Sequence, residues 1–166
     1  MTLYYQKMKS PIGNLHLVAD DLKLLAILFD SQWSAFKKKN KDLATKTNSV
    51  LDKTIDQLQE YFSGERKKFD LPLKLDGTDF QQQVWKSLGR ISYGKTKTYQ
   101  EQATLIRNPK AVRAVGRTNG LNRLCIVLPC HRVIGKSGKL TGYAGGLKAK
   151  KFLLELEGIE IQGKSL

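Results

Sequence analysis

The chain has 166 residues, 40% of them hydrophobic and 27% charged, which suits one ordinary domain or two small ones and excludes a disordered tail or a coiled coil. It contains no apolar run of the roughly 18 residues that a membrane-spanning helix needs, and its first residues lack the apolar segment of a secretory signal. Only two cysteines are present, Cys125 and Cys130. A disulfide scaffold is therefore excluded, and a reducing location is expected, which is the cytoplasm or, in a eukaryote, the nucleus.

Positive charge dominates the composition, with 29 basic against 15 acidic residues and a net charge of +14. The surplus is uneven, because residues 1–76 hold 13 basic and 10 acidic side chains whereas residues 77–166 hold 16 basic and 5 acidic ones. Between Glu101 and Glu155 the chain has no carboxylate side chain. Solubility alone does not require such a clearing, whereas repulsion from phosphates explains it, so nucleic acid is the first candidate partner. A merely solvated lysine-rich surface is the alternative.

The first half of the chain predicts a small sheet followed by one helix. Three runs rich in strand-forming residues, separated by turn residues, predict an antiparallel meander; they are residues 3–8, 15–19 and 22–29. The lysine-rich stretch 37–41 is predicted to be a solvated segment. Apolar side chains at helical spacing predict a helix over residues 50–62. Residues 65–76 are expected to form a connection with one short extended piece.

The first part of the second half, up to residue 119, predicts three helices. The first covers residues 79–91, with Asp79 as its N-cap. Thr98 is expected to cap a short helix over residues 99–106, and a third helix is predicted over residues 109–119, started by its proline. Two short helices joined by a tight turn are typical of a helix-turn-helix.

The third predicted helix has a small-residue face and a basic face. The small face consists of Ala111, Ala114, Val115 and Thr118, and the basic row consists of Lys110, Arg113 and Arg117. Small residues permit close approach of a backbone, and the basic row suits phosphates. The alternative is that the small face packs on the domain core and the basic face is only solvated.

A cysteine and a histidine stand side by side at the start of a glycine-rich segment. Residues 126–128 form a buried-strand pattern that ends at Pro129, so Cys130 is expected where a strand leaves the core. A thiol with its ordinary pKa is mostly protonated at neutral pH, and His131 and Arg132 offer a base and a positive charge. Adjacent residues of an extended segment point to opposite sides, so direct contact between thiol and imidazole does not follow from their adjacency, and a bridging water is one way to connect them. A buried structural cysteine beside a surface histidine is the alternative.

A base of this kind usually has a third group that orients it. The last predicted helix, over residues 147–157, supplies Glu155 and Glu157 as the first carboxylates after the cleared stretch. Zinc is not expected, because the chain has only two cysteines and two histidines and their spacing is not that of a usual zinc site.

These residues resemble a known family. The segment Pro129-Cys130-His131-Arg132-Val133, then Gly142-Tyr143-Ala144-Gly145-Gly146-Leu147 and then Glu157-Gly158, is similar to the O6-alkylguanine-DNA alkyltransferases, also called methylated-DNA–protein-cysteine methyltransferases. The similarity covers residues 75–160 closely, and the strand-rich first half is compatible with it. It implies an α+β protein in two domains. Residues 1–76 would be a small ribonuclease-H-like α/β scaffold with an antiparallel sheet. Residues 77–166 would be a mostly helical, winged-helix-like domain that carries the helix-turn-helix and the alkyl acceptor.

The resemblance also implies roles for individual residues. Cys130 would accept the alkyl group, His131 would take its proton through a water, and Glu157 would orient His131. Asn122 would tie the reactive segment to the recognition helix, and Tyr99 would donate a hydrogen bond to guanine N3. The substrate would further contact Val133, Tyr143, Ala144 and Lys150, and the DNA would contact Arg113, Ala114, Gly116 and Arg117. Arg113 would take the place of the flipped base.

Two positions depart from the family pattern. Arg123 follows Asn122 where proline is common, which is expected to loosen the loop or add a phosphate contact. Asn119 holds a position that is apolar in some members, which puts the wedge contact in doubt.

The implied function is DNA repair by a single transfer of the alkyl group from O6-alkylguanine, or from O4-alkylthymine, in double-stranded DNA to Cys130 after the nucleotide is flipped. No cofactor, metal or membrane is expected, and the protein is expected to be a monomer. One rival reading is a cysteine hydrolase, which would turn over. Another is a DNA-binding module without catalysis, which would never modify itself.

Overall fold

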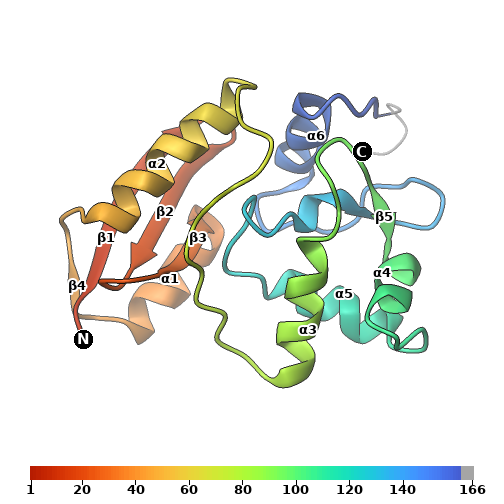
Figure 1. The fold of residues 1–166 in the computed structure, drawn as a ribbon, viewed down its shortest axis with the longest axis horizontal. Coiled ribbons are helices and arrows are strands. Elements are labelled where there is room, and N and C mark those ends of the chain that lie inside the picture. The colour runs from red at the N-terminus through yellow and green to blue at the C-terminus, as the bar shows by residue number, and fades with distance from the viewer. Residues whose placement is uncertain (162–166) are drawn as a thin grey trace. The chain divides into compact units, whose positions relative to one another are not determined.

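The computed structural model describes residues 1–161, which divide into two compact units, the first Met1–Leu75 and the second beginning at Asp76. The α+β fold class predicted from the sequence is confirmed (Figure 1). Among the described residues, none of the helices has the length and apolar character needed to cross a bilayer. In the same part of the chain, histidine, cysteine and carboxylate side chains nowhere gather in threes that could hold a metal ion.

The first unit is a four-stranded sheet with two helices. In chain order its elements are β1 (Leu3–Ser10), β2 (Gly13–Ala19), β3 (Leu24–Phe29), α1 (Asp30–Lys39), β4 (Leu43–Ala44) and α2 (Ser49–Phe62). The strand order is β3-β2-β1-β4, with antiparallel pairing between β1, β2 and β3 and a short parallel pair between β1 and β4. Nearly all of β2 is buried because it is an inner strand of the sheet and both helices pack against it. The expected meander is therefore present, with one additional edge strand.

The lysine-rich stretch is the end of a helix that the sequence reading missed. α1 packs Trp33 and Phe36 against the sheet residues Val18, Ala26 and Leu28, while Lys37–Lys39 form its exposed last turn. Cations there face the negative end of the helix dipole, which favours the helix. The apolar signal was too short to predict it, because only two aromatic side chains mark the buried face.

A buried histidine fixes the start of α1. His16 on β2 contacts Asp30, the first residue of α1, through Nε2 and Oδ1 at 2.6 Å, and the hydroxyl of Tyr5 contacts His16 Nδ1 at 2.7 Å. The rings of Tyr5, His16 and Trp33 stack within 12° of parallel. His16 therefore serves the packing of the first unit.

The second unit is mostly helical. Its elements are α3 (Asp79–Leu88), β5 (Lys97–Thr98), α4 (Tyr99–Leu105), α5 (Val112–Gly120), the 3-10 helix η1 (Cys130–Arg132), β6 (Val133–Ile134) and α6 (Leu147–Leu156). The helix-turn-helix consists of α4 and α5, and α3 packs on both. Val84, Ala103 and Val115, one from each helix, form its core, and the indole N–H of Trp85 donates to the Thr118 carbonyl at 2.9 Å.

Three local predictions in this unit were wrong. Thr78, and not Asp79, caps α3, because its hydroxyl accepts from Gln81 N at 3.1 Å in a capping box. The helix expected from Pro109 begins at Val112, because residues 108–111 form a turn closed by Ala111 N and Asn108 O at 3.0 Å. The strand expected over residues 126–128 is a tight turn.

A short parallel β-ladder joins the segment that precedes Tyr99 to the segment that follows Cys130. Lys97 pairs with Val133 and Thr98 with Ile134, so β5 lies beside β6. Tyr99 follows β5 directly, and η1, which holds Cys130, directly precedes β6. The ladder therefore places Tyr99 and Cys130 in one region of the unit.

The N-cap of α4 is expected to contribute measurably to stability. Thr98 accepts from Glu101 N at 3.1 Å, and the Glu101 carboxylate accepts from Thr98 N at 2.8 Å. Replacing such a cap by alanine costs about 1 kcal/mol, so Thr98→Ala should lower the free energy of unfolding measured in urea by that amount. Thr104→Ala on the same helix is the control, since its hydroxyl only adds a bond to the Gln100 carbonyl at 3.0 Å. Equal losses in the two variants would contradict the capping argument.

Candidate functional site

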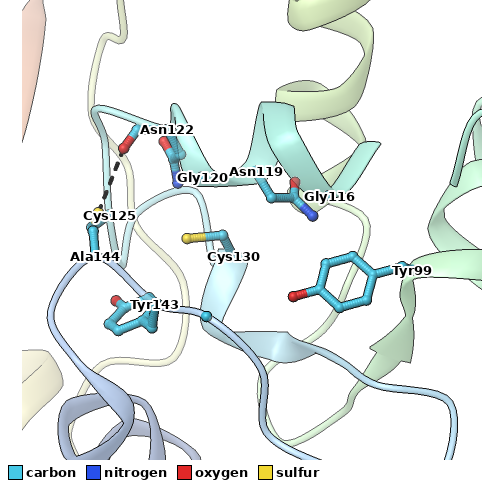
Figure 2. Close-up of a pocket in the computed structure, with 10 residues that line it drawn as sticks. Tyr99, Gly116, Asn119, Gly120, Asn122, Cys125, Cys130, Tyr143 and Ala144 are labelled. Carbon is cyan, nitrogen blue, oxygen red and sulfur yellow. Dashed lines mark hydrogen bonds between the residues drawn. The ribbon is translucent and has the colours of Figure 1, made fainter. Parts of the chain in front are cut away.

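A pocket of about 220 Å³ opens in the second unit (Figure 2). Tyr99 comes from the start of α4, and α5 contributes two glycines and an asparagine. The full lining is Tyr99, Gly116, Asn119, Gly120, Asn122, Cys125, Cys130, Gly142, Tyr143 and Ala144. Figure 2 shows the Cys130 sulfur in the middle of this group, pointing toward Cys125. Five of the residues predicted for the site, together with Gly116 of the predicted DNA contacts, thus share one pocket.

The turn that precedes Cys130 is held by Asn122. Its side-chain amide donates to the Leu128 carbonyl at 2.9 Å, and its Oδ1 accepts from Leu124 N at 2.9 Å. Ile126 has a φ of 74° there, a left-handed conformation that a β-branched residue rarely adopts. Apolar residues 126–128 read as a strand because burial alone produces the same pattern, and the positive φ carries no sequence signal without glycine.

Cys130 and His131 lie in a 3-10 helix and not on an extended segment. Arg132 N donates to the Pro129 carbonyl at 3.0 Å, which closes the turn. Cys130 is partly exposed to the pocket, whereas His131 is completely buried. The predicted extended segment is therefore wrong, and the different exposure of the two side chains arises from a helical turn.

Glu157 binds the buried imidazole. Nε2 of His131 lies 2.7 Å from Oε2 of Glu157, and neither side chain is exposed. Glu155, the other candidate carboxylate, is exposed on α6. The structure therefore selects Glu157 of the two.

Arg132 is the residue that sequence reasoning placed incorrectly. Its guanidinium donates to Glu157 through Nε at 2.8 Å and through Nη2 at 3.1 Å, and Nη1 donates to the Ile91 carbonyl at 2.7 Å. Gly94 N also donates to Glu157, at 3.1 Å. Arg132 thus holds the carboxylate that holds His131. The sequence signal for this role was that Arg132 stands next to His131 in a stretch without acidic residues.

The tautomer of His131 follows from this arrangement. The carboxylate contact assigns the ring proton to Nε2, so Nδ1 carries a lone pair. Nδ1 is buried and has no hydrogen-bond partner among the described residues. Burial lowers the pKa of His131, against the opposing effect of Glu157, so the ring is neutral at neutral pH. A neutral ring with a lone pair and a carboxylate behind it is suited to accept a proton.

The surroundings of Cys130 favour its ionised form. A hydrogen bond with Cys125 lowers the pKa of Cys130, burial opposes this, and Asn122 and the charge of Lys150 add to the lowering. Lys150 is itself buried, and its Nζ donates to the Val133 carbonyl at 2.7 Å and the Thr141 carbonyl at 2.8 Å. Burial lowers the pKa of Lys150 to about 8, which leaves it mostly protonated at pH 7.

Tyr99 lines the pocket and contacts Thr141. Its hydroxyl lies 3.0 Å from the hydroxyl of Thr141. Gly116 on α5 lies behind the Tyr99 ring, and a Cβ there would be 3.8 Å from it. A Cβ at this position would make only an ordinary contact with the ring. The glycine therefore leaves space in the pocket, but packing against Tyr99 does not require it.

The predicted DNA contacts lie on α5. Arg113 and Arg117 are exposed, and Ala114 is half-buried. Ala111 and Val115 of the small face pack on the helix-turn-helix core, as the structural alternative held for that face. The basic side chains lie on the solvent side.

Asn119 has a structural partner that the sequence did not reveal. Its Nδ2 donates to Gln102 Oε1 at 2.7 Å and its Oδ1 accepts from Gln102 Nε2 at 3.1 Å, so a pair of amides joins α4 and α5. Both side chains are buried. The amide pair explains how a polar residue is accommodated at this buried position.

Comparison with known proteins defines the class. Residues 3–75 match the family model "6-O-methylguanine DNA methyltransferase, ribonuclease-like domain", and residues 79–159 match "6-O-methylguanine DNA methyltransferase, DNA binding domain". Together these models span most of the chain, which therefore belongs to the 6-O-methylguanine DNA methyltransferase family.

Particular relatives agree with this class. The chain is 46% identical over 164 residues to the constitutive methylated-DNA–protein-cysteine methyltransferase of Bacillus subtilis, covering 97% of this chain and 99% of that protein. It is 46% identical over 160 residues to the methylated-DNA–protein-cysteine methyltransferase of Methanosarcina acetivorans, covering 94% and 99%. The crystal structure of Mycobacterium tuberculosis OGT in complex with DNA superimposes with a TM-score of 0.85 at 47% identity, covering 93% of this chain and 92% of that one.

The buried cluster predicts a large stability loss for one variant. Glu157→Gln leaves the Arg132 guanidinium buried without its counter-charge, and breaking a buried pair on one side costs about 3–5 kcal/mol. The free energy of unfolding in urea should fall by that amount, whereas Glu155→Gln, the exposed control, should change little. A double variant, Arg132→Met with Glu157→Gln, should recover part of the loss, since it leaves no unpaired buried charge. If Glu157→Gln and Glu155→Gln were equally stable, the ion pair of Arg132 and Glu157 would not have this stabilising role.

Proposed function

We propose that this chain repairs DNA by moving the alkyl group of O6-alkylguanine onto the sulfur of Cys130, once per molecule. The observation that carries the proposal is a partly exposed cysteine in a pocket, followed by a buried neutral histidine that a carboxylate and an arginine hold in place. The activity is that of the family, whose relatives bear the name methylated-DNA–protein-cysteine methyltransferase. Membership of the family supports a cysteine acceptor, and the geometry favours Cys130 over Cys125, because Cys125 is fully buried.

The proton of the Cys130 thiol passes through a water to Nδ1 of His131. Glu157 stabilises the imidazolium that forms, because its carboxylate already accepts from Nε2. The thiolate then attacks the alkyl carbon in a single displacement, in which a sulfur–carbon bond forms and the carbon–O6 bond breaks. The electron pair of the broken bond goes to the guanine, which takes up a proton, and His131 returns to its neutral form. No cofactor takes part in these steps.

The guanine becomes a better leaving group when its developing charge is neutralised. The phenol of Tyr99 lines the pocket and can donate to guanine N3. The N–H of Ala144 approaches O6, and the ring of Tyr143 flanks the base. The carbonyls of Cys130 and Val133 accept from the exocyclic amine. Since a carbonyl oxygen has two lone pairs, Val133 can accept from Lys150 and the substrate together.

The target lies inside the duplex, so the nucleotide must leave the stack. Unstacking costs a few kcal/mol, which contacts with the DNA have to offset. The exposed Arg113 of α5 enters the stack, while Arg117 contacts phosphate. Ala114 and Gly116 let the helix lie close to the backbone in a minor groove only about 6 Å wide.

The product is a thioether, which water does not cleave under mild conditions. The reaction therefore ends after one transfer, and the protein is consumed as a reagent. A cysteine hydrolase with the same residues would release product well beyond one equivalent.

We further propose how the parts of the chain divide this work. Residues 1–76 act as a scaffold domain, and residues 77–166 carry DNA binding and the acceptor cysteine. The protein acts as a monomer on double-stranded DNA in the cytoplasm, or in the nucleus of a eukaryote, where a reactive thiol stays reduced.

Intact-mass spectrometry tests the acceptor. With a short duplex containing O6-methylguanine, the protein should gain one methyl group, saturating at one per chain and located on Cys130 by tandem mass spectrometry. Cys130→Ser should gain no methyl group, because a serine hydroxyl does not ionise near neutral pH. This variant should still bind the duplex. Methyl transfer by this variant, a second methyl per chain, or an unmodified wild-type protein with a folded chain and a reduced thiol would each overturn the proposal.

A comparison of two substrates tests the role of Arg113. Arg113→Ala should slow the reaction with saturating duplex by roughly tenfold or more, since flipping costs a few kcal/mol, and should leave the reaction with free O6-benzylguanine nearly unchanged. Lys110→Ala, which removes one exposed charge from the start of the same region, should weaken duplex binding without slowing the saturated reaction. Equal losses of Arg113→Ala on both substrates would count against insertion into the stack.

A further inference from the structure

The second cysteine of the chain lies in the same pocket as the first, and the mechanism above does not use it. Cys125 and Cys130 both line the 220 Å³ pocket, and Figure 2 shows the Cys130 sulfur directed toward Cys125. Cys125 is 1% exposed, whereas Cys130 is partly open to the pocket. The thiol of Cys130 is thus accessible to a reagent, whereas the thiol of Cys125 lines the same pocket from a buried position.

A strained turn holds Cys125 in this position. Ile126, the next residue, has a φ of 74°, and strain of this kind tends to cluster at functional sites. Val127 N donates back to the Cys125 carbonyl at 2.9 Å, and Cys130 N donates to the Leu128 carbonyl at 2.8 Å. An extended segment would carry Cys125 away from Cys130, so the turn is what brings the two cysteines to one pocket.

The proton of Cys125 has two acceptors. The Cys125 sulfur lies 3.7 Å from the Asn122 carbonyl, which accepts from its thiol. The sulfur of Cys130, which lines the same pocket, is the alternative acceptor. A neutral thiol accepts weakly, but an ionised sulfur accepts a charge-assisted bond of about twice the strength of a neutral one. Rotation of one S–H bond therefore favours the thiolate of Cys130 over its neutral form.

We propose that Cys125 is a positioning residue whose thiol donates a hydrogen bond to the sulfur of Cys130 and so favours the reactive thiolate. The inference deepens the proposed function, since it concerns the nucleophile of that reaction. The bond is made to the ionised sulfur and is lost when an alkyl group removes the charge, after which the Asn122 carbonyl is the remaining acceptor.

The acid–base balance of the two thiols agrees with the geometry. The contact raises the pKa of Cys125 well above its usual range and lowers the pKa of Cys130. The other groups that act on Cys130 are Asn122 from the turn and Lys150 from α6, with the His131 cluster next to it in η1. Substitution of Cys125 leaves all of these in place, so a change in the ionisation of Cys130 can be assigned to the lost donor.

Three variants separate the donor from the packing. Cys125→Ala removes the donor, Cys125→Ser keeps a donor of similar size, and Val127→Ala shortens a half-buried side chain of the same turn outside the pocket. For each protein, the ultraviolet absorbance of the thiolate and the rate of Cys130 alkylation by iodoacetamide are measured from acidic to alkaline pH. Tandem mass spectrometry locates the adduct, and circular dichroism checks the fold.

The pH profiles of the wild-type protein and of Cys125→Ala are expected to cross. For each unit by which the pKa of Cys130 rises in Cys125→Ala, the thiolate fraction at acidic pH falls about tenfold while each thiolate becomes about threefold more reactive. The rate should therefore fall about threefold at acidic pH and rise about threefold at alkaline pH. Cys125→Ser and Val127→Ala should follow the wild-type profile. Superimposable profiles, a loss that is the same at every pH, or a serine variant that behaves like alanine would overturn the proposal.

The experiment also separates this inference from the proposed function. Iodoacetamide needs neither DNA nor guanine recognition, so a shifted profile supports the role of Cys125 even if the wild-type protein leaves an O6-methylguanine duplex unchanged. Conversely, normal methyl transfer with unshifted profiles would retain the function and reject the role of Cys125.

Discussion

The arrangement of the reactive region depends on one buried carboxylate. Glu157 follows α6 and accepts hydrogen bonds from His131, from Arg132 and from the backbone of Gly94. These groups come from segments far apart in the sequence, and the turn at Gly94 leads into β5 and then to Tyr99. Because an uncompensated charge is costly in the interior, each partner is required by the others. The same contact that orients the His131 imidazole therefore also fixes the segments that form the pocket.

Much of the fold and of the site around Cys130 could be predicted from the sequence, since the relevant signals are local. The Cys130-His131 pair, the cap at Thr98 and the periodicity of the helices each depend on neighbouring residues. Arg132 was expected to act on the cysteine because it is close in sequence, but its partner lies 25 residues away, where no local pattern can indicate it. The strand predicted over residues 126–128 failed for a related reason. Hydrophobicity reports burial, and the conformation of Ile126 is imposed by Asn122 and its bonds across the turn.

Two departures from the family pattern differ in what the structure explains. Asn119 turns inward and pairs with Gln102, and Gln102 also reaches Ser87 on α3 at 3.1 Å. A polar pair that is satisfied on both sides is compatible with burial and gives the helix-turn-helix a fixed geometry. Arg123 is exposed in the turn after α5.

The buried charges of the second unit connect its stability to its chemistry. Arg132 and Lys150 are buried cations, and Glu157 is the buried carboxylate that faces the first of them. His131 is neutral, so the cluster around Cys130 carries one surplus positive charge until the thiol ionises. A thiolate beside Lys150 balances that charge, which is why burial does not prevent ionisation at this position. Alkylation as proposed converts the sulfur into a neutral thioether and leaves the positive charge without its counterpart. The interaction that prepares the nucleophile is therefore lost in the reaction that consumes it, and no group in the pocket can restore it while the alkyl group remains.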